Sequence, residues 1–349
     1  MQIIDIKVTH THLPLEKEFR TALRTATEIP LVDIELISDS GKSGFASTCA
    51  TTKVTGETIS SICAAIKQFI FPAIVGNNVR NLNNILQKIQ DSLPNNYGAK
   101  AGIDMAVYDL YCKSLGIKLH NHLGIFRSQL SSSMTISLGN IPEMCSNAQE
   151  AVDTGFTALK IKAGKNVDED IKAIREIRNV VGKNISLRID ANQGWQKREA
   201  VRAIHALSSV GNIDFIEQPV KAHDLCGMKW IKDRVDIPIM ADESVFNYYD
   251  AMAVVQQQAA DFINIKLLKC GGIFSATKIV HAAESAGIAC MLGCMMEGPK
   301  SIESAAMFAC AHKNITMVDL DSLYFLREFT LPSYITYAKG NISIKTNLS

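Results

Sequence analysis

Ionisable residues end five successive strand-like segments of this chain, at nearly constant intervals. The first segment, ALKIK, ends at Lys162, and the next four end at Asp190, Glu217, Asp242 and Lys266. These positions lie 28, 27, 25 and 24 residues apart, which is room for one strand, one helix and their loops. Because parallel α/β folds place their chemistry at the carboxyl ends of their strands, we expect these five residues to surround one pocket.

The alternation extends over eight strand-like segments and predicts a barrel. The segments lie near 134–138, 157–162, 186–190, 213–217, 237–241, 261–266, 288–292 and 316–319. Helical segments separate most of them, and several of these end at a glycine, as helices commonly do. Eight strands with helices in fewer than 200 residues fit a TIM-like barrel better than an open sheet.

The first part of the chain has a different order of elements. Three strand-like segments (3–15, 29–39 and 43–52) precede three helical ones, which indicates a small α+β domain. The last 25 or so residues return to strand-like alternation and are expected to pack back on that domain. We therefore predict an α+β domain over 1–125, completed by about 325–349, and a barrel domain over 126–324.

Charge and cysteine content narrow the possible partners and location. The formal net charge is +1 and no apolar run is long enough to span a bilayer, so we expect neither a nucleic-acid nor a membrane partner. The N-terminus has no signal-peptide pattern. Nine cysteines without a CxxC motif are typical of reduced thiols, so the predicted location is the cytoplasm.

Three of the strand-end residues are carboxylates and together predict a metal site. The three carboxylates come from consecutive strands: Asp190, Glu217 and Asp242. Clustered carboxylates repel one another, so all three stay ionised at low energetic cost only beside a cation. An all-oxygen ligand set favours a hard divalent ion, with Mg²⁺ preferred and Mn²⁺ as a substitute. A single aspartate of this kind could be a loop residue or a helix cap, but three in register favour the metal.

Lysines flank this predicted metal site. Lys160 and Lys162 are two residues apart on one strand and therefore point to the same side, while Lys266 lies across the barrel mouth. Crowding among ammonium groups and a metal is expected to lower a lysine pKa, which produces a usable base. A base on each face of a carbon next to a metal-bound carboxylate predicts proton removal through an enediolate, leading to racemisation, epimerisation or β-elimination.

The order of five motifs resembles the muconate-lactonising-enzyme subgroup of the enolase superfamily. The motifs are K-x-K, D-A-N-x-x-W, E-Q-P, A-D-E-S and N-I-K, at 160–162, 190–195, 217–219, 241–244 and 264–266. The similarity covers essentially the whole chain. It implies a modified TIM barrel, (β/α)7β, beneath an N-terminal α+β capping domain, with Mg²⁺ on Asp190, Glu217 and Asp242.

The resemblance also implies roles for further residues. Lys162 and Lys266 would be the acid/base pair and Lys160 an electrostatic partner, while Asn192 and Glu243 would order the metal or a lysine. Asp319 and Asp321 form a D-x-D motif like the one that binds the free α-amino group in the dipeptide epimerases of this subgroup. The alternative is that Asp321 caps the following turn.

Other residues are expected to contact the substrate. Arg24, in FRTALRT, resembles the loop arginine that meets a glutamate side chain in L-Ala-D/L-Glu epimerases, although Arg20 is equally available. Thr135 matches another substrate-contacting position. Met296 and Glu297, in a loop reshaped by Gly298-Pro299, are expected to line the specificity pocket and to leave broader L-Ala-X substrates open.

These features predict a cytoplasmic, Mg²⁺-dependent dipeptide epimerase that acts on L-Ala-D/L-Glu or a related L-Ala-X by two-base 1,1-proton transfer. A role in salvage of peptidoglycan peptides and assembly into a homo-oligomer are expected as well. The alternatives are an N-acylamino acid racemase or o-succinylbenzoate synthase of the same superfamily, and a metal-binding barrel without catalysis.

Overall fold

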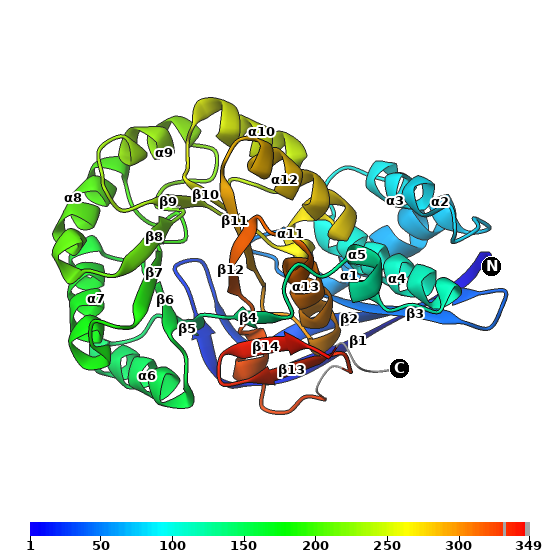
Figure 1. The fold of residues 1–349 in the computed structure, drawn as a ribbon, viewed down its shortest axis with the longest axis horizontal. Helices are drawn as coiled ribbons and strands as arrows, with labels where there is room; N and C mark the ends of the chain where they lie inside the picture. The colour runs from blue at the N-terminus through cyan, green and yellow to red at the C-terminus, as the bar shows by residue number, and fades with distance from the viewer. Residues whose placement is uncertain (331–332, 346–349) are drawn as a thin grey trace.

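The chain folds into a capping domain and a barrel, which lie side by side in Figure 1. The computed structural model describes residues 1–330 and 333–345. The capping domain comes first in the chain, at the blue end of the colour scale, and the helices of the barrel form an arc around its strands. The predicted modified barrel with an α+β capping domain is confirmed.

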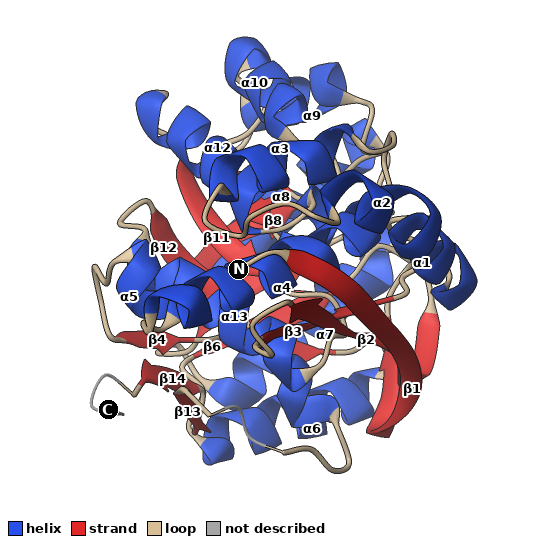
Figure 2. Cartoon of the chain, turned by 90° about the vertical axis from the view of Figure 1, so that its right-hand side faces the viewer, coloured by secondary structure: helices blue, strands red, loops and turns tan. Residues whose placement is uncertain are grey.

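An antiparallel sheet and a group of helices form the capping domain. Its strands β1 (Ile3–Arg20), β2 (Thr25–Ser38) and β3 (Ser43–Cys49) pair in that order. The helices that follow are α1 (Ile59–Ala65), η1 (Ile66–Ile70), α2 (Phe71–Ile74), α3 (Leu82–Asp91), α4 (Tyr97–Leu115) and α5 (Leu119–Leu123). Figure 2 shows long β1 curving around the edge of this domain. Helix α4 is buried along most of its length because it packs against the sheet on one side and the barrel on the other.

Strands β1 and β2 run further than the predicted 3–15 and 29–39. Pairing resumes after an irregularity between Pro14 and Phe19 and continues until Arg20 meets Thr25. The tip of this hairpin docks beside the first barrel strand, where Leu138 donates its backbone N–H to the Arg20 carbonyl over 3.0 Å. The capping domain therefore reaches the barrel mouth through a paired hairpin rather than a free loop.

Eight parallel strands make the barrel, and all eight lie where the sequence predicted them. They are β5 (Met134–Ile136), β6 (Ala158–Lys162), β7 (Ser186–Asp190), β8 (Ile213–Glu217), β9 (Ile239–Ala241), β10 (Phe262–Ile265), β11 (Ala289–Gly293) and β12 (Ile315–Asp319). A bridge between Ser132 and Val318 joins the first strand region to the last and closes the barrel. Phe215, Met240 and Met291 pack together inside, so the interior is a core and not a channel.

Seven of the eight strands are followed by helices. These are α6 (Ile141–Thr154), α7 (Val167–Val181), α8 (Lys197–Leu207) with the turn η2 (Ser208–Val210), α9 (Leu225–Lys232), α10 (Tyr248–Gln257), α11 (Leu267–Cys270) with α12 (Ile273–Ser285), and α13 (Pro299–Ala311). After β12 comes only the single turn η3 (Ser322–Phe325). No helix of the described residues is long and apolar enough to cross a membrane.

The chain then returns in a short hairpin, β13 (Ile335–Ala338) and β14 (Asn341–Ile344). Strand β14 pairs with β4 (Gln129–Ser131), which leads into the barrel, and the preceding segment meets the capping sheet at a bridge between Leu15 and Leu326. The tail thus contacts both parts of the molecule. The division of the chain at residue 125 stays a prediction.

Strand register brings the charged strand ends together. Lys162 pairs with Asp190 across β6 and β7, and Asp190 pairs with Glu217 across β7 and β8. Lys160, two residues earlier on β6, lies one layer deeper and pairs with Arg188. Because side chains alternate along a strand, this register points all of these residues into the barrel, while their immediate neighbours along each strand point outward.

We predict that Gly164→Ala destabilises the protein by about 3 kcal/mol or more, since overpacking adds to an unfavourable backbone conformation. Gly164 has φ +101°, and a Cβ there would lie 2.0 Å from the Ala191 carbonyl oxygen. Gly116→Ala is the control, because its φ is +69° but nothing lies within 4 Å of the added carbon. It should cost only about 1–2 kcal/mol. Equal losses in urea unfolding would contradict the packing explanation.

Candidate active site

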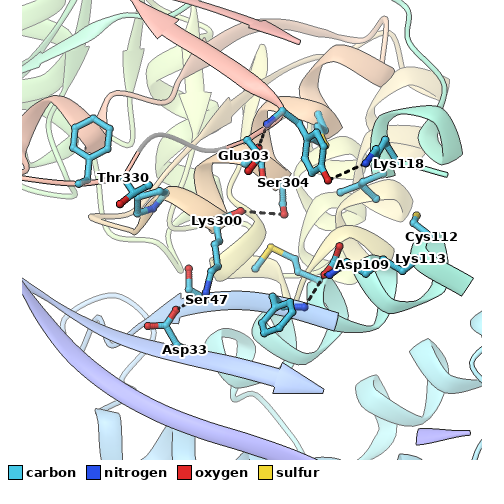
Figure 3. A pocket seen from close by; sticks show the side chains of 18 of the residues that line it. Asp33, Ser47, Asp109, Cys112, Lys113, Lys118, Lys300, Glu303, Ser304 and Thr330 are labelled. Carbon is cyan, nitrogen blue, oxygen red and sulfur yellow. Dashed lines mark hydrogen bonds and ion pairs between the residues drawn. The ribbon is translucent and has the colours of Figure 1, made fainter. Parts of the chain in front are cut away.

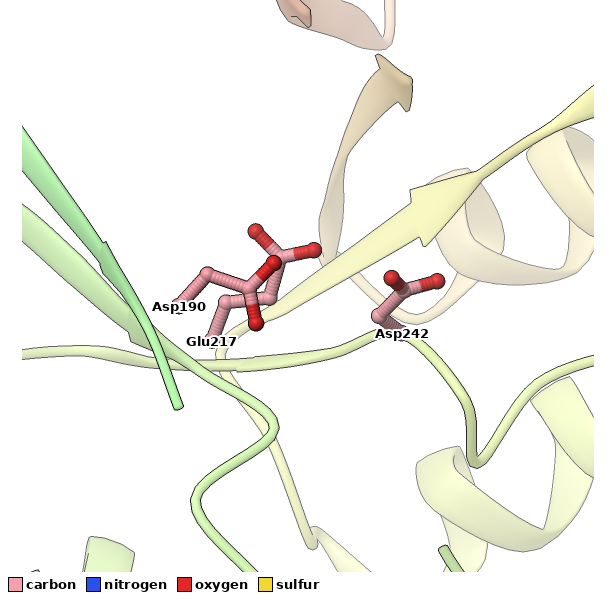
Figure 4. A group of neighbouring side chains, drawn as sticks. All are labelled: Asp190, Glu217 and Asp242. Atoms are coloured by element: carbon pink, nitrogen blue, oxygen red, sulfur yellow. The ribbon is translucent and has the colours of Figure 1, made fainter. Parts of the chain in front are cut away.

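Asp190, Glu217 and Asp242 converge at the carboxyl ends of β7, β8 and β9, as Figure 4 shows. One oxygen from each carboxylate lies within 4.8 Å of the others. All three side chains are buried. The structure therefore brings together the three residues that the sequence predicted as metal ligands.

The chemistry of this cluster fits a hard divalent cation. Burial and the nearby charge of Asp190 raise the pKa of Glu217 to about 8, which indicates excess negative charge among these groups. Among the described residues, Oε2 of Glu217 has no hydrogen-bond donor of suitable geometry, although it lies 2.9 Å from Nζ of Lys160. Oxygen ligands with spare negative charge are what Mg²⁺ prefers, and these residues would hold it.

The predicted acid/base lysines approach the carboxylates from two sides. Nζ of Lys162 lies 2.7 Å from Oδ2 of Asp190, and Nζ of Lys266 lies 2.6 Å from Oδ2 of Asp242. Lys160 sits deeper, between Asp190, Glu217 and Asp319, at 2.9–3.2 Å from each. Lys162 and Lys266 can therefore exchange a proton with a group placed over the carboxylate cluster, whereas Lys160 is enclosed by its three partners.

Within the protein alone, the pKa values of Lys160 and Lys266 are raised, and the lowering expected beside a bound metal stays a prediction. Burial opposes the charged form of each ammonium, but the surrounding carboxylates outweigh burial and raise the pKa of both lysines. Asp319, Glu217 and Asp190 do so for Lys160, and Asp242 does so for Lys266. The sequence argument weighed repulsion between amines and a metal but omitted their attraction to paired carboxylates.

Lys269 belongs to the site, although the sequence analysis did not single it out. It is buried on the single-turn helix α11 and donates to Oδ1 of Asp242 over 2.6 Å and to the Asn264 carbonyl over 3.0 Å. Its three-residue spacing from Lys266, one helical turn, was the available signal. Asp242 thus has a lysine on each carboxylate oxygen.

Amide side chains tie the strand ends to one another. Asn264 donates to Oε1 of Glu217 over 2.8 Å, and Gln218 accepts from the Asp242 backbone N–H over 2.9 Å. Asn192 donates to Oε1 of Glu243 over 3.2 Å, while its own N–H bonds to Oδ1 of Asp190. These bonds set the spacing of the predicted metal ligands. Asn192 and Glu243 thus lie beside the cluster, and the supporting role expected for them stays a prediction.

The pKa values of Asp319 and Asp321 shift in opposite directions although the two residues lie two positions apart. Asp319 accepts from Lys160 over 2.9 Å and from the Ser133 hydroxyl over 3.0 Å, and Lys160 outweighs burial to lower its pKa. Asp321 accepts from the Thr135 backbone N–H over 2.6 Å, and burial together with Asp319 raises its pKa to about 7. Its side chain makes no capping bond to η3. A cation beside Asp321 would relieve this burial cost.

A small cavity of about 60 Å³ lies among these lysines and aspartates. Lys160, Lys162, Lys266, Thr135, Asp319, Asp321 and Met296 line it, and residues of the hairpin tip cover it. Arg24 belongs to that cover, and its guanidinium makes no ion pair or hydrogen bond within the described part of the chain; burial lowers its pKa. Arg20 instead pairs with Glu18 and faces a different cavity.

Glu297 does not line the cavity. Its carboxyl group turns back and accepts the Met295 backbone N–H over 2.9 Å. Burial raises its pKa to about 8. Glu297 therefore lies behind Met295 and Met296, which line the cavity, and its hydrogen bond to Met295 stabilises this loop.

A larger cavity of about 640 Å³ lies between the capping sheet, α4, α13 and the tail (Figure 3). Its charged residues are satisfied locally: Lys113 pairs with Asp109 over 2.7 Å and Lys300 with Asp33 over 3.2 Å. Lys118 donates to the Tyr334 hydroxyl. These paired groups offer no arrangement for catalysis comparable to the carboxylate cluster.

Comparisons with known proteins agree with this geometry. The model of the mandelate racemase / muconate lactonizing enzyme N-terminal domain matches residues 3–124, and an enolase C-terminal domain-like model matches residues 143–347. An L-Ala-D/L-Glu epimerase of Clostridium acetobutylicum is 46% identical over 92% of this chain and 90% of its own length.

Two solved structures superpose over nearly the whole chain. The substrate-liganded L-Ala-D/L-Glu epimerase from Bacillus subtilis has a TM-score of 0.96 at 41% identity, covering 99% of this chain and 96% of that one. The dipeptide epimerase of Enterococcus faecalis V583, in complex with Mg and L-Leu-L-Tyr, has a TM-score of 0.93 at 36% identity, covering 99% and 97%.

We predict that Lys269→Met destabilises the metal-free protein by about 2–3 kcal/mol, because it leaves Oδ1 of the buried Asp242 carboxylate without its lysine while Oδ2 keeps Lys266. Mg²⁺ should restore part of this stability by replacing the lost charge, so the rise in Tm on adding Mg²⁺ should be larger in the variant than in the wild type. Lys278→Met, an exposed change on α12, is the control. An equal Tm rise in variant and wild type would contradict the charge-pairing role of Lys269.

Proposed function

This chain belongs to the mandelate racemase / muconate lactonizing enzyme family of enolase-like proteins, and we propose that it is an isomerase that epimerises dipeptides with Mg²⁺ as its cofactor. The observation that carries this proposal is the position of Asp319 and Asp321 in the cavity that Lys162 and Lys266 also line. One cavity thus holds acid/base groups and an acceptor for an ammonium group.

The two lysines supply proton transfer. Each contacts a different carboxylate of the cluster, so a carbon placed between them has an amine on each face. One lysine, as the free amine, takes the α-proton, and the other, as ammonium, returns a proton to the opposite face, which inverts the centre. Mg²⁺ on Asp190, Glu217 and Asp242 would stabilise the charge that develops on the substrate carboxylate and would weaken the hold of these residues on the lysine protons. By analogy with the family, Lys162 serves the L epimer and Lys266 the D epimer.

The aspartates select a substrate with a free amino group. Asp319 is already paired with Lys160, whereas Asp321 is held by Thr135 with its charge uncompensated. An ammonium group supplies that compensation, and an N-acylated amino acid or a cyclic acid does not. The N-acylamino acid racemase and o-succinylbenzoate synthase alternatives are therefore less well supported.

The second residue of the dipeptide is proposed to be glutamate or a related residue. Arg24 covers the cavity without a partner among the described residues, and a carboxylate side chain would pair with it in bidentate geometry. The relatives from Clostridium acetobutylicum and Bacillus subtilis carry the L-Ala-D/L-Glu name. Cytoplasmic location, homo-oligomeric assembly and a role in peptidoglycan peptide salvage stay predictions.

The function is tested by proton NMR in D₂O with Mg²⁺ and a panel of L-Ala-X dipeptides that includes L-Ala-L-Glu. We expect the C-terminal α-proton signal to disappear while the diastereomer appears. Exchange on N-succinyl amino acids, with none on any dipeptide, would favour the racemase alternative. Absence of exchange on every substrate would favour a non-catalytic protein.

Lysine variants separate the two half-reactions. Lys266→Ala should lower the rate of epimerisation by about 10³-fold or more. The variant should still exchange the α-proton of L-Ala-L-Glu, because the base for the L epimer remains. Lys162→Ala should show the converse with L-Ala-D-Glu. Lys165→Ala, an exposed neighbour, is the control and should be unaffected. Wild-type epimerisation by Lys266→Ala would refute the two-base mechanism.

Arg24 sets the preference for an acidic second residue. Arg24→Met should lower kcat/KM for L-Ala-L-Glu by about 10²-fold, the loss expected for a charge-assisted hydrogen-bonded pair, while L-Ala-L-Met loses far less. Arg20→Met, on the same hairpin but paired with Glu18, should leave the ratio of the two substrates unchanged. An unchanged ratio in Arg24→Met would show that the glutamate side chain binds elsewhere.

A further inference from the structure

Leu320 lies between the two aspartates, and both its backbone N–H and its carbonyl are hydrogen-bonded. Its N–H donates to the Ser132 hydroxyl over 2.8 Å, and its carbonyl accepts from the Tyr337 hydroxyl. Asp319 and Asp321 flank this residue, so its orientation fixes where both carboxylates point. The barrel strand β12 itself ends at Asp319, and strand pairing therefore no longer holds the chain there.

Both of these bonds lead to the hairpin β13–β14. Tyr337 is part of β13, and Ser132 donates its backbone N–H over 2.8 Å to the carbonyl of Gly340, in the hairpin turn. Lys339 and Gly340 form that turn with φ values of +52° and +73°, as a two-residue hairpin turn of type I′ requires. The hairpin thus holds the carbonyl of Leu320 directly, through Tyr337, and its N–H indirectly, through Ser132.

Aromatic packing keeps the hairpin in place. The rings of Tyr324 and Tyr337 are 4.7 Å apart, and Phe156 meets Tyr324 edge-on at 4.9 Å. The Tyr324 hydroxyl accepts the Gly340 N–H over 3.0 Å. Burial raises the pKa of the Tyr337 hydroxyl, so this group remains a hydrogen-bond donor at neutral pH. Lys162 and Lys266 are held by separate contacts, to Asp190 and Asp242.

We propose that the hairpin β13–β14 is part of the substrate-recognition site, with Tyr337 as a positioning residue that fixes the Leu320 peptide and so aims Asp319 and Asp321 at the ammonium group of the dipeptide. This inference rests on the proposed function, because it takes the two aspartates as the ammonium site. It assigns Tyr337 no part in proton transfer or in metal binding.

The test compares a ligand that has the ammonium group with one that lacks it. For the Mg²⁺-loaded enzyme, KM and kcat are measured with L-Ala-L-Glu, and Ki with N-propionyl-L-glutamate, which has hydrogen in place of the amino group. Tyr337→Phe should raise KM by about tenfold, the scale of one lost hydrogen bond, with kcat within about twofold. Ki for the propionyl compound should change by less than about twofold, since it has no ammonium group to lose.

Tyr334→Phe is the matched control, because its hydroxyl accepts from Lys118 and does not reach Leu320. It should leave KM and Ki unchanged. Tyr324→Phe is a second variant that acts through Gly340, and it should raise KM in the same direction by a smaller factor. Mg²⁺ affinity and Tm, measured for each variant, show whether the fold and the metal site are intact.

The outcomes separate this inference from the proposed function. Equal rises of KM and Ki in Tyr337→Phe, or a KM equal to that of Tyr334→Phe, would overturn the positioning role while the wild type remains an epimerase. If Tyr337→Phe does not fold, an unchanged KM in Tyr324→Phe overturns it. A wild type that neither binds nor epimerises any dipeptide would refute the proposed function, and this inference with it.

Discussion

Pairing of buried charges is the constraint on which the rest of this structure depends. Lys160 has essentially no exposed surface and touches three carboxylates, and burying any of these groups alone would cost several kcal/mol. The barrel makes the burial possible because its register sets each charge beside an opposite one. A divalent cation on Asp190, Glu217 and Asp242 would add a further positive partner for these buried carboxylates.

The barrel and the central site could be predicted because both follow from a repeat along the chain. Spacing of about 25 residues predicts strands, and charges at the strand ends then must converge. Lys269 was missed because it lies one helical turn beyond its strand, where no strand-end rule applies. The pairing of Lys160 with three carboxylates was missed because it depends on the three-dimensional register of the strands. The extension of β1 past Pro14 depends on contacts with the barrel, which a local pattern does not contain.

The capping domain and the carboxylate cluster are linked through a short path. Asp104 on α4 accepts the backbone N–H groups of Ile273 and Phe274 and so caps α12. Gly272, which precedes α12, leaves room for this carboxyl group, since a Cβ there would lie 2.4 Å from it. A carboxyl group from the chain itself thus occupies the N-terminus of α12. Lys269, just before the glycines, connects the same segment to Asp242.

The late position of the hairpin β13–β14 in the chain bears on how the protein is made. The barrel closes only when Val318 meets Ser132, and Leu320 is held on both sides only once the segment up to Ile344 is available. These contacts join residues separated by almost two hundred positions, so they form late and slowly. During synthesis on the ribosome, Lys160 therefore remains without Asp319, one of its three carboxylate partners, until most of the described chain has emerged.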